Sequence, residues 1–131
     1  MKQISGLICG AVALAVWLAA PSPAAAQFNL DSYKCYKAKD LKQPKFIATT
    51  VSLDDQFTDG TYTAKKPFVF CNPVDKGGAG ILNATDHLTC YKIKGPKFDG
   101  PNVQIANDFG SLKLDTKKPF LLCVPSLKQV L

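Results

Sequence analysis

The chain has 131 residues and a formal net charge of +6, which comes from sixteen lysines and ten aspartates without any arginine or glutamate. Arginine is the residue that forms bidentate hydrogen bonds with phosphate and with the edge of guanine, and this chain has none. No stretch has the pattern of a recognition helix either, so we expect no nucleic-acid partner. The positive charge instead suits an acidic polymer or surface.

Residues 1–26 are expected to be a secretory signal peptide. Lys2 precedes an apolar run over residues 4–20, and small residues in an A-x-A pattern follow at residues 24–26. The run is shorter than the roughly 20 apolar residues of a membrane-spanning helix, which favours a cleaved leader over an anchor. We therefore expect a secreted or periplasmic protein with no transmembrane segment after removal of the leader.

The chain after the leader contains an internal sequence repeat. Residues 31–76 align with residues 86–128 when residues 41–43 are skipped, and 17 of the 43 aligned positions are identical. Such self-similarity predicts a duplicated structural unit. We place the first β repeat at residues 27–76, a glycine-rich connector at residues 77–85 and the second β repeat at residues 86–131.

Each repeat is predicted to form three or four short strands. The alternation of Val103 and Ile105 with Gln104 and Ala106 is typical of a half-buried strand. Abundant Thr, Val, Phe and Tyr favour strands, and no stretch after the leader has helical periodicity with caps. The expected strands are residues 33–39, 46–53, 61–64 and 68–71 in the first repeat, and residues 88–94, 102–106, 112–115 and 120–123 in the second.

Four cysteines follow the leader, namely Cys35, Cys71, Cys90 and Cys123. An even number in an exported chain predicts disulfides, and none of them forms the closely spaced pairs that are typical of zinc sites. The four cysteines can pair in three ways. In one of them both disulfides lie within a repeat, and in the other two both disulfides join one repeat to the other. We favour Cys35 with Cys71 and Cys90 with Cys123, since duplication copies a bond with its scaffold, and each bridge then contributes roughly 3 to 4 kcal/mol.

The size of the repeat decides the expected fold. A unit of about 45 residues buries too little surface to be stable without a staple or a neighbour. We therefore predict an all-β fold of two tandem, pseudo-symmetric, disulfide-stapled β units, packed as one sandwich-like or barrel-like domain or standing as two small lobes. The phrase Lys-Lys-Pro at residues 65–67 and 117–119 is predicted at a strand start or a sheet edge, because proline cannot donate to a ladder and lysine protects an edge.

Three motifs occur in the same order in both repeats: C-Y-K-x-K, P-K-F and K-K-P-F-x-x-C-x-P. In the first repeat they occupy residues 35–39, 44–46 and 65–73. This arrangement resembles a family of exported bacterial proteins with a duplicated cysteine-containing domain of unknown function, and the resemblance covers nearly all of the chain after the leader. It implies a bacterial, exported, duplicated module, and it implies no activity, ligand or catalytic residue.

The sequence offers no constellation for catalysis or metal binding. The one histidine, His87, corresponds to Ser32 in the first repeat, and the chain has no glutamate, so neither a repeated Ser-His-Asp triad nor a 2-His-1-carboxylate site can be assembled. Asp54, Asp55 and Asp59 have no acidic counterparts in the second repeat, which favours a solvated turn over calcium ligands. We expect no cofactor, no metal and no enzymatic activity.

The leading functional prediction is a non-enzymatic binding or structural module of the cell envelope or the extracellular space, with an acidic polymer or an envelope protein as its partner. The alternatives are an inhibitor that presents the loop at residues 54–60 to a secreted hydrolase, or a small enzyme. Binding is predicted at the lysines that recur in both repeats and at the tyrosines beside the cysteines. These residues are Lys37, Lys39, Lys65, Lys66, Lys92, Lys94, Lys117, Lys118, Tyr36 and Tyr91.

Overall fold

A computed structural model describes Gly10 and residues 28–131, so the predicted signal peptide lies, apart from Gly10, outside the described residues. In this part of the chain the secondary structure is all β, as predicted, and no helix is long and apolar enough to cross a membrane. The strands are β1 (Ser32–Lys37), β2 (Thr49–Asp54), β3 (Asp59–Val74), β4 (His87–Lys94), β5 (Asn102–Asn107), β6 (Gly110–Asp115) and β7 (Leu121–Ser126).

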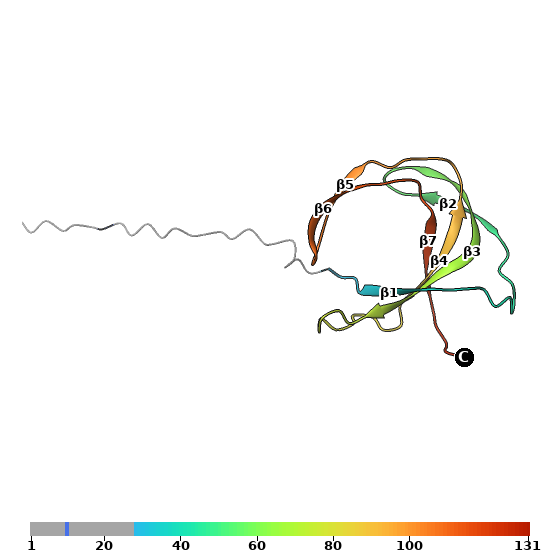
Figure 1. Cartoon of the computed structure of the whole chain (residues 1–131), viewed down its shortest axis with the longest axis horizontal. Helices are drawn as coiled ribbons and strands as arrows, with labels where there is room; N and C mark the ends of the chain where they lie inside the picture. The colour runs from blue at the N-terminus through green and yellow to red at the C-terminus, as the bar shows by residue number, and fades with distance from the viewer. Residues whose placement is uncertain (1–9, 11–27) are drawn as a thin grey trace, which may run out of the picture.

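One antiparallel sheet joins the two repeats. Its order is β1-β3-β4-β7, and β2 also pairs with β3, beside β1. The central contact is the pairing of β3, the last strand of the first repeat, with β4, the first strand of the second. The hairpin of β5 and β6 forms a separate sheet. Figure 1 shows the strands curving around a common centre, and the sheets do not close into a barrel.

The two predicted disulfides are present, and they occupy equivalent places in the repeats. Cys35 and Cys71 lie directly opposite each other on β1 and β3, with their α-carbons 4.0 Å apart. Cys90 and Cys123 lie opposite each other on β4 and β7, at 3.9 Å. Each bridge therefore fastens the first strand of a repeat to its last strand.

The repeats differ in how the second half of the unit is built. The expected strands 61–64 and 68–71 are one 16-residue strand, β3, whereas their counterparts in the second repeat remain two strands, β6 and β7. The placement of Lys-Lys-Pro at a strand start is therefore wrong for residues 65–67, which lie inside β3. The alternative placement at an edge applies to one side of β3, because β1 pairs with residues 69–74 and β2 with residues 59–64. Pro67 is tolerated there because the β3–β4 register shifts between Pro67 and Val69. The placement is right for residues 117–119, which precede β7.

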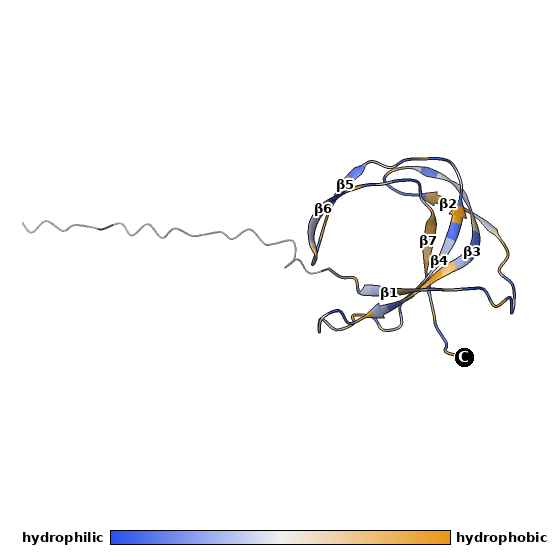
Figure 2. Ribbon diagram, in the orientation of Figure 1, coloured by the Kyte–Doolittle hydropathy of each residue, from blue (hydrophilic) through white to orange (hydrophobic). Residues whose placement is uncertain are grey.

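The small core lies where the repeats meet. Its buried apolar side chains include Tyr62, Ala64 and Cys71 of β3 and Cys90 of β4, each at most 5 % exposed, and Pro73 of β3 is buried as well. Figure 2 shows apolar residues on β4 and β7 and more polar residues on β1. Because each repeat contributes so few buried side chains, the disulfides and the β3–β4 pairing must supply much of the stability.

Candidate functional site

The repeated lysines of the first repeat gather at a hollow of about 420 Å³. β1 pairs with the C-terminal half of β3 and β2 with its N-terminal half, so the loop that joins β1 to β2 spans the middle of β3. Residues 38–46 of this loop form one wall of the hollow, and residues 65–68 of β3 form the other. The lysines that line it are Lys39, Lys42, Lys45, Lys65 and Lys66.

A second hollow, of about 370 Å³, lies in the second repeat. Residues 92–97, at the end of β4 and in the loop that follows, form one wall, and residues 118–120 before β7 form the other. The lysines that line it are Lys92, Lys94, Lys97 and Lys118. We call these two sites the first and second lysine hollows.

The two lysine hollows are built from equivalent positions of the repeat. In both, one lysine is the last residue of the C-Y-K-x-K motif, one comes from the P-K-F motif and one from the K-K-P-F motif, and a Pro-Phe pair follows the last of these. The equivalent lysines are Lys39 and Lys94, Lys45 and Lys97, and Lys66 and Lys118. The two aligned segments therefore share a lysine-lined hollow as well as matched disulfides.

The lysine hollows adjoin each other at the junction of the repeats. Lys66 of the first hollow and Lys92 of the second are register partners on β3 and β4, so their side chains leave the same face of the sheet. The ammonium group of Lys92 lies 4.3 Å from the ring centroid of Phe68, which lines the first hollow. A ligand long enough to leave one hollow therefore meets the other directly.

The positive charge of the lysine hollows is largely uncompensated. The ion pairs in the described part of the chain join Lys76 to Asp108 and Lys117 to Asp115. None of these four residues lines a lysine hollow. The second hollow contains no acidic residue. Like charges brought together on one surface favour the binding of an anion that relieves their repulsion.

The first hollow contains one acidic residue, Asp40, whose carboxylate organises the loop. It accepts hydrogen bonds from the backbone N–H groups of Lys42 and Phe46, both at 2.8 Å. Both hydrogen bonds favour the ionised carboxylate and lower the pKa of Asp40 below its ordinary value of 3.8, and the bond from Phe46 has the larger effect. Gly95 occupies the equivalent position in the second repeat, so this anchor is specific to the first hollow.

The structure brings six of the predicted binding lysines into the hollows and leaves two outside. Lys37 extends from β1 and pairs in register with Val69, and Lys117 forms its ion pair with Asp115. Neither lines a lysine hollow. The six that do are Lys39, Lys65 and Lys66 in the first hollow and Lys92, Lys94 and Lys118 in the second.

The two predicted binding tyrosines lie in different environments. Tyr91 of β4 is half-buried and packs against Phe46, with ring centroids 5.0 Å apart. Tyr36 of β1 is 46 % exposed, and the ammonium group of Lys34 lies 5.4 Å from its ring centroid. Tyr91 therefore holds the repeats together, while Tyr36 is open to solvent.

Three lysines that line the hollows were missing from the predicted set: Lys42, Lys45 and Lys97. Lys45 and Lys97 are the central residues of the two P-K-F motifs, so the repeat itself carried a signal for them. Lys42 lies in the three-residue insertion of the first repeat, and its position follows from the Asp40 loop, which the sequence pattern does not reveal.

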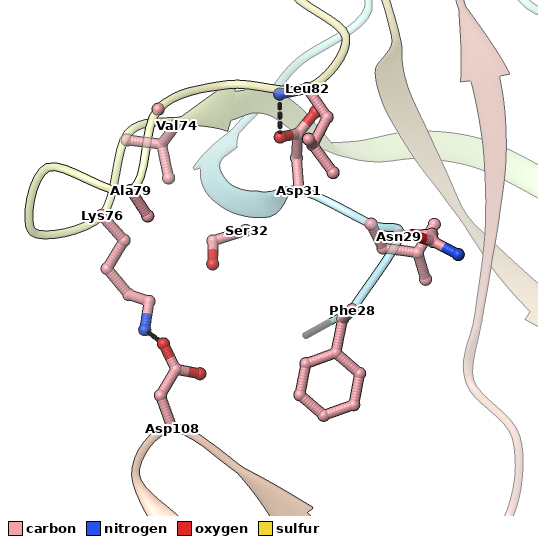
Figure 3. A pocket seen from close by; sticks show the side chains of 11 residues that line it. Phe28, Asn29, Asp31, Ser32, Val74, Lys76, Ala79, Leu82 and Asp108 are labelled. Carbon is pink, nitrogen blue, oxygen red and sulfur yellow. Dashed lines mark hydrogen bonds and ion pairs between the residues drawn. The ribbon is translucent and has the colours of Figure 1, made fainter. Parts of the chain in front are cut away.

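Another hollow, of about 440 Å³, shares no lining residue with the lysine hollows (Figure 3). Asp31 accepts hydrogen bonds there from the backbone N–H groups of Leu82 at 2.6 Å and Asn83 at 2.9 Å, and Lys76 forms its ion pair with Asp108. The Asp31 contacts join the connector to the residue before β1, and the Lys76–Asp108 pair joins the segment after β3 to the turn between β5 and β6. Its charged side chains are thus already paired within the protein.

The remaining candidates for chemistry have structural surroundings. His87 is 6 % exposed, stacks on Phe70 with ring centroids 5.7 Å apart, and lines neither lysine hollow. The Asp55 carboxylate accepts hydrogen bonds from the backbone N–H groups of Phe57 and Thr58 and so stabilises the turn between β2 and β3. Among Gly10 and residues 28–131, no cluster of three or more His, Cys, Asp or Glu side chains could hold a metal ion.

Comparison with models of protein families, with characterised proteins and with solved structures finds no match. The resemblance to an exported bacterial family stays a prediction. The functional argument therefore depends on the geometry of the two lysine hollows.

Proposed function

We propose that this protein is an exported, non-enzymatic binding module of the cell envelope or extracellular space, and that it holds an acidic polymer in its two lysine hollows. The observation that supports this proposal is the equivalence of the hollows: three lysines and a Pro-Phe pair recur at matched positions, although only 17 of 43 aligned residues are identical. The two disulfides suit an oxidising compartment outside the cytosol.

A polymer is a better ligand for this arrangement than a small anion. Because the hollows adjoin at Lys66 and Lys92, one chain of regularly spaced negative charges can occupy both, and binding in the second hollow becomes an intramolecular step. Lysine presents a compact charge on a flexible stem and lacks the planar fork of arginine. We therefore expect the charge density of the polymer to matter more than the geometry of its anionic groups.

The test is direct binding of acidic polymers to the disulfide-intact protein. Polyglutamate and polyphosphate are titrated in parallel with dextran, which has similar length and no charge. Both acidic polymers should bind and dextran should not. Raising the salt concentration from about 50 to about 300 mM shortens the screening length about 2.5-fold and should weaken binding steeply. Absence of binding at the lower salt concentration, or an affinity that does not change with salt, would contradict the proposal.

A further inference from the structure

We propose that the outer edge of β7 binds β1 of a second copy of this protein, in the same antiparallel register in which β3 binds β4 inside each copy. β7 is the counterpart of the C-terminal half of β3, and β1 is the counterpart of β4. The sheet order β1-β3-β4-β7 leaves β1 and β7 at its two edges. Within residues 28–131, no strand pairs with either outer edge.

The direction of the backbone groups shows that both edges can pair. The cysteines of each bridge are directly opposed with α-carbons at most 4.0 Å apart, which is the close spacing of a pair that exchanges no backbone hydrogen bonds. Three residues further along, the bonds from Ala38 N–H to Phe68 C=O at 2.9 Å and from Ile93 N–H to Phe120 C=O at 3.1 Å confirm this alternation. The backbone groups of Cys35 and Cys123 therefore point outward, to the open edges.

The same alternation identifies the other donors. In β7 the N–H groups of Leu121 and Cys123 point outward, whereas Pro125, at the next outward position, has none. In β1 the outward N–H groups are those of Tyr33, Cys35 and Lys37. These are the counterparts of the β4 positions that face β3.

The exposure of side chains on β7 and β1 is the pattern expected if these strands form the same interface as β3 and β4 but lack the partner strand. The clearest contrast is at the bridge cysteines, which are buried at the β3–β4 junction and open at their counterparts on β7 and β1. Cys71 is 2 % exposed and Cys90 3 %, while Cys123 and Cys35 are both exposed. Phe68 is half-buried beneath Lys92, while its counterpart Phe120 is 62 % exposed.

The tyrosines behave in the same way. Tyr91 packs on Phe46 of the preceding repeat. Its counterpart Tyr36 is 46 % exposed on β1, whose outer edge has no partner strand among the described residues, and the counterpart of Phe46 is Phe98 in the second repeat. Placing β1 of a second copy on β7 brings Tyr36 to the position from which it can pack on Phe98.

We attribute the break between β6 and β7 to the same missing partner strand at the outer edge of β7. β3 is continuous through residues 65–67, where β4 pairs across it, whereas residues 116–120 form no strand between β6 and β7. No strand pairs across residues 116–120 from the outer side in the described part of the chain. Strand β7 also lacks any charged residue, although lysine is the usual protection of an open edge.

The internal pairing also fixes the expected register between copies. The pairs Cys71 with Leu88 and Val69 with Cys90 translate to Cys123 with Tyr33 and Leu121 with Cys35 of the next copy. Because the two surfaces differ, the contact is head-to-tail, and a dimer formed through it keeps one open β1 edge and one open β7 edge. Association therefore continues beyond the dimer, to a ring or a filament, and places the lysine hollows of successive copies in one row.

The first test uses the unmodified, disulfide-intact protein. Sedimentation velocity over a concentration series should show species larger than a dimer, and amide hydrogen exchange should slow with concentration at both edges, by about tenfold or more at Leu121, Cys123, Tyr33 and Cys35. A protein that stays monomeric overturns the proposal. Slowed exchange on β7 alone, which indicates pairing of β7 with β7, or association without slowed exchange at either edge, also overturns it.

A second test uses a variant and a matched control. Leu121→Pro removes an outward N–H group without removing a donor to β4, as Pro125 already does two positions later, and should raise the concentration of half-association about tenfold. Leu127→Pro, beyond the strand and 91 % exposed, should leave association unchanged. Equal weakening in both variants, or none in Leu121→Pro, contradicts edge pairing. If Leu121→Pro loses its fold, the exchange measurement on the unmodified protein decides.

Discussion

The ring of Tyr62 lies directly against the α-carbon of Gly95. Tyr62 is a β3 residue that is 4 % exposed, and Gly95 follows β4 immediately. A β-carbon on Gly95 would overlap the Cγ, Cδ1 and Cε1 atoms of that ring. The buried position of the Tyr62 ring, in the first repeat, therefore requires a residue without a side chain at position 95 in the second repeat.

Replacement of Gly95 by alanine should destabilise the protein by about 1–3 kcal/mol, because Tyr62 must leave its place in a core of few residues. Urea denaturation with intact disulfides measures the change in the free energy of unfolding. A double-mutant cycle with Tyr62→Ala provides the control, since the cost of Gly95→Ala should nearly vanish once the ring is absent. An unchanged cost in that background would show that the ring contact is not the cause.

His87 is predicted to be replaceable by phenylalanine with a gain in stability. Its ring stacks on Phe70, and its Nδ1 atom is buried without a hydrogen-bond partner among the described residues. Phenylalanine keeps the stacking and removes the unsatisfied nitrogen, which should stabilise the protein by up to about 1 kcal/mol. His87→Ser introduces the residue that the first repeat has at this position, Ser32, and should lower the midpoint of thermal unfolding. A lower midpoint in His87→Phe would indicate that Nδ1 has an essential partner.

The sequence was sufficient to predict the features that the two aligned segments share. The matched cysteines indicated the pairs Cys35–Cys71 and Cys90–Cys123, because they occupy equivalent positions of the alignment, and the recurring lysines indicated most of the lysines that line the hollows. These inferences need only the alignment of the repeats. They hold because equivalent residues occupy equivalent places relative to their own repeat.

The features that differ between repeats could not be predicted in this way. Residues 65–67 and 117–119 have the same sequence, yet the first triplet lies inside β3 and the second precedes β7. The difference depends on whether a neighbouring strand pairs across the triplet, which is a property of the sheet and not of the local residues. The inclusion of Lys42 similarly depends on two backbone hydrogen bonds to Asp40.

The loop of the first lysine hollow should loosen at low pH. The N–H groups of Phe46 and Lys42 lower the pKa of Asp40, so the ionised carboxylate stabilises the loop at pH values above its ordinary pKa of 3.8. This stabilisation is lost as the pH falls through the lower pKa of the folded state. Amide chemical shifts of Lys42 and Phe46 should follow the titration, whereas those of Leu122 and Cys123, which are distant from any aspartate in the sequence of the second repeat, should not. Asp40→Asn should abolish the response, and a response that persists would assign it to another group.

Each disulfide should contribute comparably to stability. The bridges close segments with sequence separations of 36 and 33 residues, for which the chain-entropy model gives about 4 kcal/mol each. The paired variants Cys35→Ser with Cys71→Ser, and Cys90→Ser with Cys123→Ser, should each lose most of this amount in urea denaturation. Because the core is small, removal of both bridges should unfold the chain at room temperature. A double loss that leaves cooperative unfolding intact would show that the β3–β4 pairing stabilises the fold by itself.

Lysines inside the hollows should matter more for the binding of polyglutamate than lysines elsewhere. K39Q/K45Q/K66Q removes the repeated lysines of the first hollow and K94Q/K97Q/K118Q those of the second. Each set should weaken binding about tenfold at low salt, because the polymer loses one of its two adjoining sites. The control K34Q/K113Q/K128Q removes the same charge from positions outside both hollows and should change the affinity by less than about twofold. If the control weakens binding as much as either hollow set, then net charge alone attracts the polymer and the hollows are not its site.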